Sequence, residues 1–490
     1  MKTDAQYLAW LKSSAALRCV LIEVGVRSGE SEITRYLSNS GYTSGPNDAP
    51  ANTYYRSVIA GGVTLTESLM VDAGGVLNAG DIELHNQDGN LDAWFNDIWV
   101  NRPIKVFSGD KRWPRDDFRL VFDGVVADVD SRSADRFNIK LRDKLQRLNA
   151  PISEEKLGDF TANADRLVPL TFGECHNVTP MLTNPATHEY QFHAGPVEGV
   201  IEVRDEGVPV AHTVDIAAGT FKLLQSNAGN ITASVQGDKP GSYANTVAPI
   251  VQRLATAYGT AQNRFTDADI DAGNFAEFAA TAKQPVGIFI EQRANVLQTI
   301  QELAASVGAQ PVMSREGKLR LLRLELPGYG LPVVLTASSM VAGSFRMAER
   351  IEVLAGVQVA YCKNWTVQAQ LQTAIPPEHK DLFAQEWLTK TVKDSTVASN
   401  YRMFSEPVQQ TTYLLVAQDA QAEAVRRLNF RKQTRQVYEF EGFEECFMLN
   451  LGQAVTIKHY RFGMTQGVPA IVKSLALDHL NARVTVQVLI

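Results

Sequence analysis

Apolar and polar residues alternate along many short stretches of the chain, which is the pattern of strands with one buried face. In the first 150 residues this alternation predicts strands at residues 20–26, 58–69, 104–107, 119–127 and 136–141. After residue 340 it predicts a second set at residues 435–440, 447–449, 454–459, 470–477 and 483–489. Segments rich in Gly, Ser, Pro and Asn separate the strands, so the fold is expected to be mainly β.

A different pattern occupies the middle of the chain, where apolar residues recur every three or four positions. Residues 247–258 and 295–307 each carry one such stripe, and Gly308 follows the second as a helix-ending residue. A strand, a tight turn and a strand are expected at residues 310–324. Nearer the C-terminus, Asp419 is predicted to cap a further helix. The middle segment is therefore expected to be an inserted α+β module.

Two distant segments of the chain share one plan. Each is a strand, a loop, a strand that opens at Gly-Val, a polar turn and an alternating strand. The first copy comprises residues 103–109, 124–126 and 136–141, and the second comprises residues 453–457, 467–472 and 483–488. Antiparallel sheets are stable when they close and lose their edges, so this internal repeat predicts two small β-barrels. Three copies of such a chain would set six barrel units around one axis.

Four domains are expected, because a chain of 490 residues is long for one hydrophobic core. The Gly- and Pro-containing run at residues 237–242 marks the change from strand to helix patterning. The predicted domains are an N-terminal β-barrel (1–150), an inserted β-rich domain (151–240), an α+β module (241–330) and a C-terminal β-barrel (331–490).

Composition narrows the classes of function. Hydrophobic residues make up 45% of the chain and charged residues 21%, as in folded rather than disordered proteins. The net charge of −7 argues against nucleic acid as the main partner, because phosphate-binding surfaces need clustered Lys and Arg. The first 20 residues lack the apolar core of a signal peptide. No run of about 18 apolar residues is present, so no membrane-spanning segment is expected.

A candidate metal site lies in the middle of the chain. Cys175, His176, His188 and His193 fall within nineteen residues and could supply sulfur and nitrogen ligands to zinc. Against zinc, Cys175 and His176 are adjacent, so on a strand they would face opposite sides. The favoured interpretation is a structural joint between domains, and metal binding is left open. The four scattered cysteines are expected to be free thiols of a protein made in a reducing cytoplasm.

Motifs for catalysis are missing from the sequence. It contains no Gly-x-Ser-x-Gly elbow, no His-Glu-x-x-His and no Gly-x-x-x-x-Gly-Lys-Ser/Thr loop. The carboxylate doublets Glu154-Glu155 and Glu444-Glu445 consist of neighbours, which on a strand face opposite ways and form no natural acid/base pair. The basic run 426–432 is expected to form salt bridges to a neighbouring subunit rather than to bind nucleic acid. No catalytic, cofactor-binding or metal-binding residue is assigned.

Three segments carry a family resemblance: residues 80–92 (GDIELHNQDGNLD), 168–180 (VPLTFGECHNVTP) and 451–457 (LGQAVTI). In these segments the chain resembles the central baseplate hub, or tail-tip, proteins of tailed bacteriophages, particularly those with long non-contractile tails. The resemblance implies a homotrimer whose barrels, as hub domains, form a ring under the tail tube. The family has no shared catalytic residues to carry over. Some tail-tip proteins hold an iron–sulfur cluster through grouped cysteines, and this chain lacks that grouping.

The function expected from this resemblance is that of a structural virion protein. A trimeric baseplate hub would adapt the sixfold tail tube to a threefold tip during host entry and line part of the DNA exit channel. Its partners would be its own copies, the tail tube or distal tail protein, and tip and fibre proteins, with passing contact to phage DNA. It would reside in the virion tail after assembly in the host bacterial cytoplasm. The alternative is a tail-associated cell-wall hydrolase.

Overall fold

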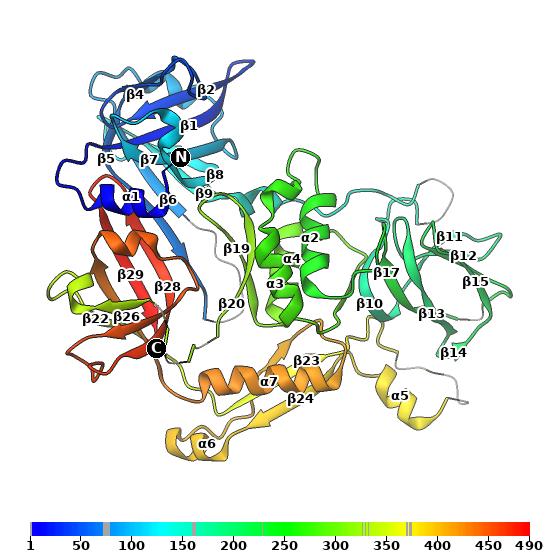
Figure 1. The fold of residues 1–490 in the computed structure, drawn as a ribbon. Helices are drawn as coiled ribbons and strands as arrows, with labels where there is room; N and C mark the ends of the chain where they lie inside the picture. The colour runs from blue at the N-terminus through cyan, green and yellow to red at the C-terminus, as the bar shows by residue number, and fades with distance from the viewer. Residues whose placement is uncertain are drawn as a thin grey trace. The chain divides into compact units, whose positions relative to one another are not determined.

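The computed structural model describes residues 2–71, 79–158, 163–227, 229–325, 327–328, 330–331, 333–368, 371 and 375–490. The chain divides into two units (Figure 1). Unit 1 comprises Met1–Arg147, Gln310–Glu352 and Thr434–Ile490, and unit 2 comprises Leu148–Ala309 and Val353–Gln433. The chain therefore passes between the units four times, and unit 2 is inserted into unit 1 as two separate segments. The boundaries of the four predicted domains stay a prediction.

Unit 1 is built on one large sheet. Over the described residues the main path of this sheet runs β22-β26-β29-β28-β5-β6-β9-β8-β7-β1-β2-β4-β3, with β27 paired to β28 and β21 paired to β27. Its strands are β1 (Arg18–Ser28), β2 (Ser31–Ser38), β3 (Tyr42–Thr43), β4 (Tyr54–Ser57), β5 (Ile59–Ser68), β6 (Ala79–His85), β7 (Pro103–Asp110), β8 (Arg119–Asp130), β9 (Arg136–Asp143), β21 (Val334–Thr336), β22 (Arg346–Ile351), β26 (Arg435–Gly442), β27 (Ala454–Lys458), β28 (Val468–Asp478) and β29 (Arg483–Leu489).

The remaining elements of unit 1 are short. They are helix α1 (Asp4–Leu11), the hairpin of β19 (Ala309–Met313) and β20 (Leu319–Arg323), and the 3-10 helices η1 (Asp92–Asn96), η2 (Arg115–Asp117), η3 (Lys144–Leu148), η5 (Ala337–Ser339) and η6 (Glu444–Met448). The predicted strand at residues 447–449 is therefore wrong. Phe447 lies in η6 because the backbone N–H of Cys446 donates to the carbonyl of Phe443, which turns both side chains into the core.

The mainly β prediction is confirmed, whereas the two closed barrels are not formed. None of the sheets closes on itself within the described part of the chain. The reason lies in β28, whose outer edge is divided between two strands. Its first residues pair with β27, and its last residues, from Ser474 to Asp478, pair with β5. The sheet therefore continues from one half of the unit into the other.

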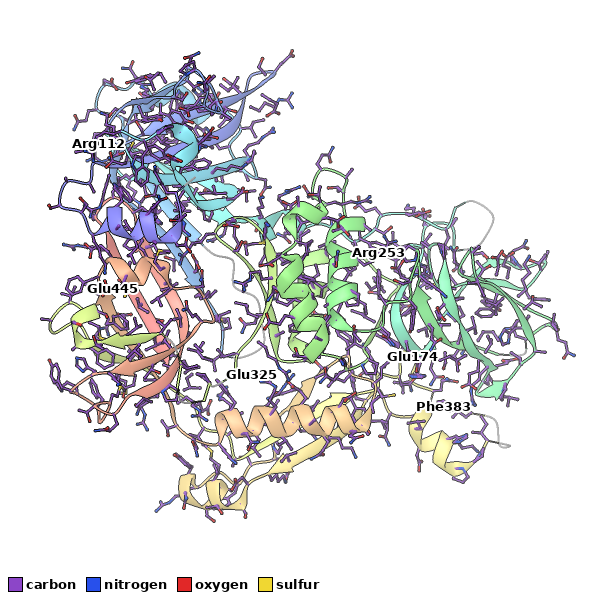
Figure 2. The ribbon with its side chains drawn as sticks, viewed as in Figure 1. Arg112, Glu174, Arg253, Glu325, Phe383 and Glu445 are labelled. Carbon is purple, nitrogen blue, oxygen red and sulfur yellow. The ribbon has the colours of Figure 1, made fainter. Side chains whose placement is uncertain are left out.

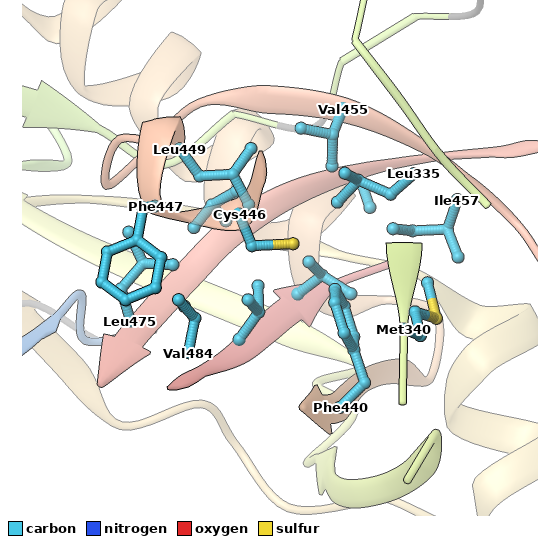
Figure 3. Close-up of a cluster of buried hydrophobic side chains, with 14 of the residues drawn as sticks. Leu335, Met340, Phe440, Cys446, Phe447, Leu449, Val455, Ile457, Leu475 and Val484 are labelled. Atoms are coloured by element: carbon cyan, nitrogen blue, oxygen red, sulfur yellow. The ribbon is translucent and has the colours of Figure 1, made fainter. Parts of the chain in front are cut away.

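The alternating pattern acts as predicted where one face of a strand is buried. In β29, Val484, Val486 and Val488 are fully buried and the residues between them reach solvent. Two apolar clusters result. One joins β1, β5, β6, β7, β8 and β9, and the other joins β26, β27, β28 and β29 with η6. Figure 3 shows the second cluster, in which Phe440, Val455 and Leu475 surround Cys446.

Unit 2 contains smaller sheets and most of the helices. A five-stranded sheet has the order β14-β13-β17-β10-β18, a four-stranded sheet the order β11-β12-β16-β15, and a three-stranded sheet the order β24-β23-β25. Its strands are β10 (Leu170–Val178), β11 (Met181–Asn184), β12 (Glu189–Gln191), β13 (Val197–Asp205), β14 (Val208–Pro209), β15 (His212–Asp215), β16 (Thr220–Leu223), β17 (Ile231–Asp238), β18 (Gly287–Ile290), β23 (Gly356–Tyr361), β24 (Leu388–Lys393) and β25 (Gln409–Thr411).

The helices of unit 2 are α2 (Val247–Ala257), α3 (Ala272–Thr281), α4 (Val296–Ser306), α5 (Pro377–Phe383), α6 (Ser395–Tyr401) and α7 (Ala417–Arg431), with the 3-10 helix η4 (Asp267–Asp269). Helix α2 contacts α3 and α4, and α7 lies along β23 and β24 (Figure 1). The predicted stripes of α2 and α4 are confirmed as buried faces. The predicted cap is wrong: α7 begins at Ala417 after Val416, so Asp419 lies within its first turn.

Candidate functional site

Unit 1 contains the same five-stranded arrangement twice. The first repeat has the order β5-β6-β9-β8-β7, and the second repeat has the order β22-β26-β29-β28-β27. Every pairing in both repeats is antiparallel. A 3-10 helix precedes the third strand in chain order each time, η1 before β7 and η6 before β27. Only the second repeat is interrupted by unit 2, between β22 and β26.

One row of residues crosses each repeat at the same place. In the first repeat the directly opposed residues are, in order, Leu65, Gly80, Leu141 and Val126. In the second repeat they are Met347, Tyr438, Val488 and Val472. At the first three matched positions of the row the two repeats have different residues, and only the last position has valine in both. The two repeats are therefore alike in their backbone pairing.

A β-bulge follows each row at the same position. After Val126 the register of β8 against β9 shifts by one residue, so that Asp128 lies opposite Lys140. After Val472 the register of β28 against β29 shifts in the same way, and Ser474 lies opposite Gln487. A bulge leaves one residue unpaired and bends its strand. Its recurrence gives β8 and β28 a bend at the same point.

The backbone beside each bulge is held by the same two hydrogen bonds. Val126 accepts a bond from the Asn101 N–H (2.8 Å) and donates one to the carbonyl of the residue after Asn101 (2.9 Å). Val472 accepts from the Gly452 N–H (2.9 Å) and donates to the carbonyl of the residue after Gly452 (2.9 Å). Asn101 and Gly452 both have a positive φ, of 61° and 76°, which Asn and Gly tolerate best.

These contacts confirm the predicted strand plan and extend it. Each repeat has two further strands, β5 and β6 or β22 and β26, that the predicted repeat did not include, although strands were predicted at residues 58–69 and 435–440. One detail of the prediction is wrong, because β8 begins at Arg119 and passes through Gly124 rather than opening there. By their hydrogen bonds Val126 and Val472 are structurally equivalent. Gly124 therefore corresponds to Ala470.

The Cys-His stretch in unit 2 divides over both faces of β10, as its spacing predicts. Cys175 is fully buried, and burial raises the pKa of its thiol well above the usual value. His176, its neighbour, is half exposed and lies 3.1 Å from a carboxylate oxygen of Glu174. The bond with His176 lowers the pKa of Glu174. Glu174 is labelled in Figure 2.

His193 belongs to a buried polar cluster. Its Nδ1 accepts a hydrogen bond from the Thr171 N–H at 3.0 Å, so the proton of the neutral ring is on Nε2, which lies 3.4 Å from Asp238. Arg253 also donates to Asp238, at 2.8 Å (Figure 2). Burial raises the pKa of Asp238, but the bonds from His193 and Arg253 outweigh it and leave that pKa below its usual value. The cluster joins β10 and β17 to α2.

His188 occupies the turn between β11 and β12, with a φ of 50°, and its carbonyl accepts a hydrogen bond from Leu223. In the described ranges no group of three or more His, Cys, Asp or Glu side chains is placed to hold a metal ion. All four cysteines are free. Among the helices of the described residues, none is long and apolar enough to cross a membrane.

One glutamate of each carboxylate doublet forms a salt bridge. Glu154 is exposed and pairs with Arg293 at 2.7 Å. Glu445 lies on η6 and pairs with Lys12 at 3.3 Å (Figure 2). Other carboxylates meet in a pocket of about 460 Å³ in unit 2, whose lining includes Glu291, Glu302, Glu386, Lys363, Trp365 and Tyr413. Glu302 accepts a hydrogen bond from the Tyr413 hydroxyl at 2.9 Å, and Lys363 lies over the Trp365 ring.

Two arginines of the basic run on α7 form salt bridges within the chain, and the expected bridges to a neighbouring subunit stay a prediction. Glu423 is buried and accepts hydrogen bonds from Arg426 and Arg427, each at 2.7 Å. Arg427 also donates to the carbonyl of Ala305 at 2.9 Å, which ties α7 to the end of α4. Burial raises the pKa of Glu423, but the two arginines outweigh it and lower that pKa below its usual value. These arginines are therefore engaged inside unit 2.

No protein-family model and no curated protein matches the sequence. Among solved structures, the chain is similar to a tail protein from Neisseria meningitidis MC58, with 12% identity over 96% of both chains and a TM-score of 0.41. A 43 kDa tail protein of prophage MuSo2 from Shewanella oneidensis has 12% identity over 96% of this chain and 98% of its own, with a TM-score of 0.43. A prophage tail protein from Listeria monocytogenes EGD-e has 8% identity over 95% and 94%, with a TM-score of 0.38. Likenesses at these values establish neither a shared fold nor a shared function.

Proposed function

We propose that this protein is a structural component of a phage tail, and specifically a baseplate hub. The observation that carries the proposal is the register-matched repeat of unit 1. A chain with two equivalent sheet modules presents six modules when three copies surround one axis. Such a ring can face a sixfold tube on one side and a threefold tip on the other. The sequence resemblance of residues 80–92 and 451–457, both inside unit 1, supports the same assignment.

The proposed partners follow from the ring. The tail tube or distal tail protein would sit above it, tip and fibre proteins below it, and phage DNA would pass through its channel. Assembly would take place in the host cytoplasm before the protein resides in the virion tail. The N-terminal and C-terminal hub domains (1–150 and 331–490) would supply the modules, and the inserted domains (151–240 and 241–330) lie between them in the sequence. No chemical step is required of it.

Light scattering on the purified full chain tests this proposal. The expected mass is three times the chain mass of 53.9 kDa. Electron microscopy of the same particles should show rings with threefold symmetry. Particles that remain monomeric at all concentrations, and that fail to form rings with a tail-tube protein, would contradict the hub.

The cell-wall hydrolase is the second candidate, and the glutamate-lined pocket of unit 2 is the observation in its favour. Hydrolysis of a glycan needs two carboxylates placed across a cleft. A zymogram on peptidoglycan should show no clearing if the hub proposal holds. Clearing by the wild-type chain that disappears in Glu302→Gln, but persists in the exposed control Glu154→Gln, would establish the hydrolase instead.

A further inference from the structure

The two repeats meet within the chain at one strand edge, here named the closed junction. Beyond its bulge, β28 of the second repeat pairs with β5 of the first, from Ser474 opposite Ser68 to Asp478 opposite Thr64. The contact continues past β5, since the Leu69 N–H donates to the carbonyl of Lys473 at 2.9 Å. Strand β28 of the second repeat thus pairs with β5, the first strand of the first repeat.

The counterparts of these two edges are open. β8 corresponds to β28, yet it pairs with β7 only as far as Val125, and no described strand pairs with Asp128–Asp130 on that side. β22 corresponds to β5, and within the described ranges its one partner is β26. Each chain therefore has one closed junction and the two halves of a second junction that are not joined.

Apolar side chains are buried at the closed junction and exposed at the open edges. Leu451, just before Gly452, is 7% exposed, whereas its counterpart Val100, just before Asn101, is 49% exposed. Leu65 of β5 is 2% exposed, whereas its counterpart Met347 of β22 is 42% exposed. Unpaired strand edges with exposed apolar side chains readily add another strand. The difference between counterparts is what a missing neighbour would produce.

Aromatic side chains extend the apolar surface beside β22. Tyr438, opposite Met347, packs against Phe462 at 5.1 Å between ring centroids. Phe462 is 46% exposed, and Tyr460 in the same loop is 69% exposed. In the first repeat the corresponding loop between β7 and β8 places Phe118 inside the core. The loop between β27 and β28, beside the open β22 edge, therefore exposes more apolar surface than the corresponding loop of the first repeat.

We infer that β8 of one copy pairs with β22 of the next copy, and that this open junction reproduces between chains the closed junction within the chain. This inference rests on the proposed ring of three copies. Leu475 lies opposite Glu67 in the closed junction, and their counterparts are Val129 and Arg350. The same register sets Asp130 opposite Glu349. Each of these carboxylates already has a lysine, Lys140 at 2.6 Å and Lys473 at 2.7 Å, which offsets their repulsion.

The contact joins two different surfaces, so it is head-to-tail rather than self-complementary. Head-to-tail contacts produce a closed ring when the rotation per copy divides a full turn. In a ring of three copies, three closed junctions would alternate with three open junctions that are now paired. No β8 or β22 edge would then remain unpaired. A symmetric dimer would bury neither edge against its proper partner.

A pair of engineered cysteines tests the pairing. Directly opposed residues of antiparallel strands are close enough for a disulfide, so Val129→Cys with Arg350→Cys should link neighbouring copies under mild oxidation. The double variant should give covalent trimers on non-reducing gels, and reductant should reverse them. An equimolar mixture of the two single variants should stop at dimers, because each chain then offers one half of the link. The wild-type chain, with its own four cysteines, is the control.

The outcomes separate this pairing from the hub proposal. A wild-type trimer by light scattering whose double variant gives no covalent trimer would overturn the β8–β22 contact and leave the trimer intact. A monomeric wild type without any link would overturn both. Dimers from either single variant alone would show a symmetric contact and would also overturn the head-to-tail pairing.

Discussion

The two repeats of unit 1 share strand order, residue row and bulge, but they differ in the turn that follows the bulged strand, which is β8 or β28. In the second repeat that turn is covered: His479 is 3% exposed, and its N–H donates to the carbonyl of Val63 in β5 at 3.3 Å. In the first repeat residues 131–134 of the same turn are exposed. One backbone plan thus has two environments, and a neighbouring strand is paired beside the turn in only one of them.

The largest effect is expected from removing a core ring in either repeat. Phe137 in the first repeat and Phe440 in the second are both fully buried. Replacing either by Ala should lower the free energy of unfolding by about 3–5 kcal/mol. Because β5 and β28 join the repeats into one sheet, each variant should destabilise both repeats together. Hydrogen exchange of peptides from both repeats in increasing urea measures this.

An exposed substitution in the same unit, Ile33→Ala, is the control for that comparison and should change stability little. Exchange that accelerates in only one repeat of a variant would show that the closed junction does not couple them.

A smaller effect is expected from pH, and the covered turn contributes part of it. Burial, with the nearby Arg315 and Arg119, lowers the pKa of His479 to about 3, whereas an unfolded histidine has a pKa of about 6.5. Between these values the unfolded chain binds a proton that the folded chain does not. Stability should therefore fall as the pH falls from about 6.5 toward 3, by about 1.4 kcal/mol per pH unit from this residue.

The variant His479→Leu should have a shallower pH dependence of unfolding, measured by urea titration between pH 7 and pH 4. His85→Leu, at an exposed position of the first repeat, should keep the wild-type slope. Equal slopes for all three chains would mean that His479 is not buried as a neutral ring.

The smallest effect concerns the matched positive-φ residues. Gly452→Ala should cost about 1 kcal/mol, since a Cβ disfavours this φ and would lie 3.2 Å from Leu322. Asn101→Gly should change stability by only a few tenths of a kcal/mol, because Asn already adopts this conformation. Thermal melting of both variants measures the difference. A loss of similar size in both would contradict the equivalence of the two positions.

Local patterns predicted the strands that bury one face and failed where burial depends on distant partners. The alternation in β29 is read from its sequence, and so are the opposite faces of Cys175 and His176. β22 escaped prediction because Arg346–Arg350 are all exposed and show no alternation. The local sequence could not predict the open sheet either, because it depends on pairing between residues far apart in the sequence, such as Leu65 and Leu477.

The buried polar clusters were missed for a related reason. Asp238 and Arg253 lie far along the sequence from His193, and no local spacing connects them. Glu423 sits near Arg426 and Arg427 on α7, so here the helical spacing of three and four residues did carry a signal. Glu423, the acid that binds these arginines, lies just before the basic run 426–432.

The pairing of β5 with β28 also sets the order in which a growing chain can complete its fold. β5 leaves the ribosome early, and its partner edge is not synthesised until residues 474–478 have been added. Contacts this distant in sequence form slowly, because a long loop must close before they contribute. Unit 2 and most of the first repeat can fold in the meantime. A chain whose synthesis has not reached β28 therefore still lacks the partner of β5 in the closed junction.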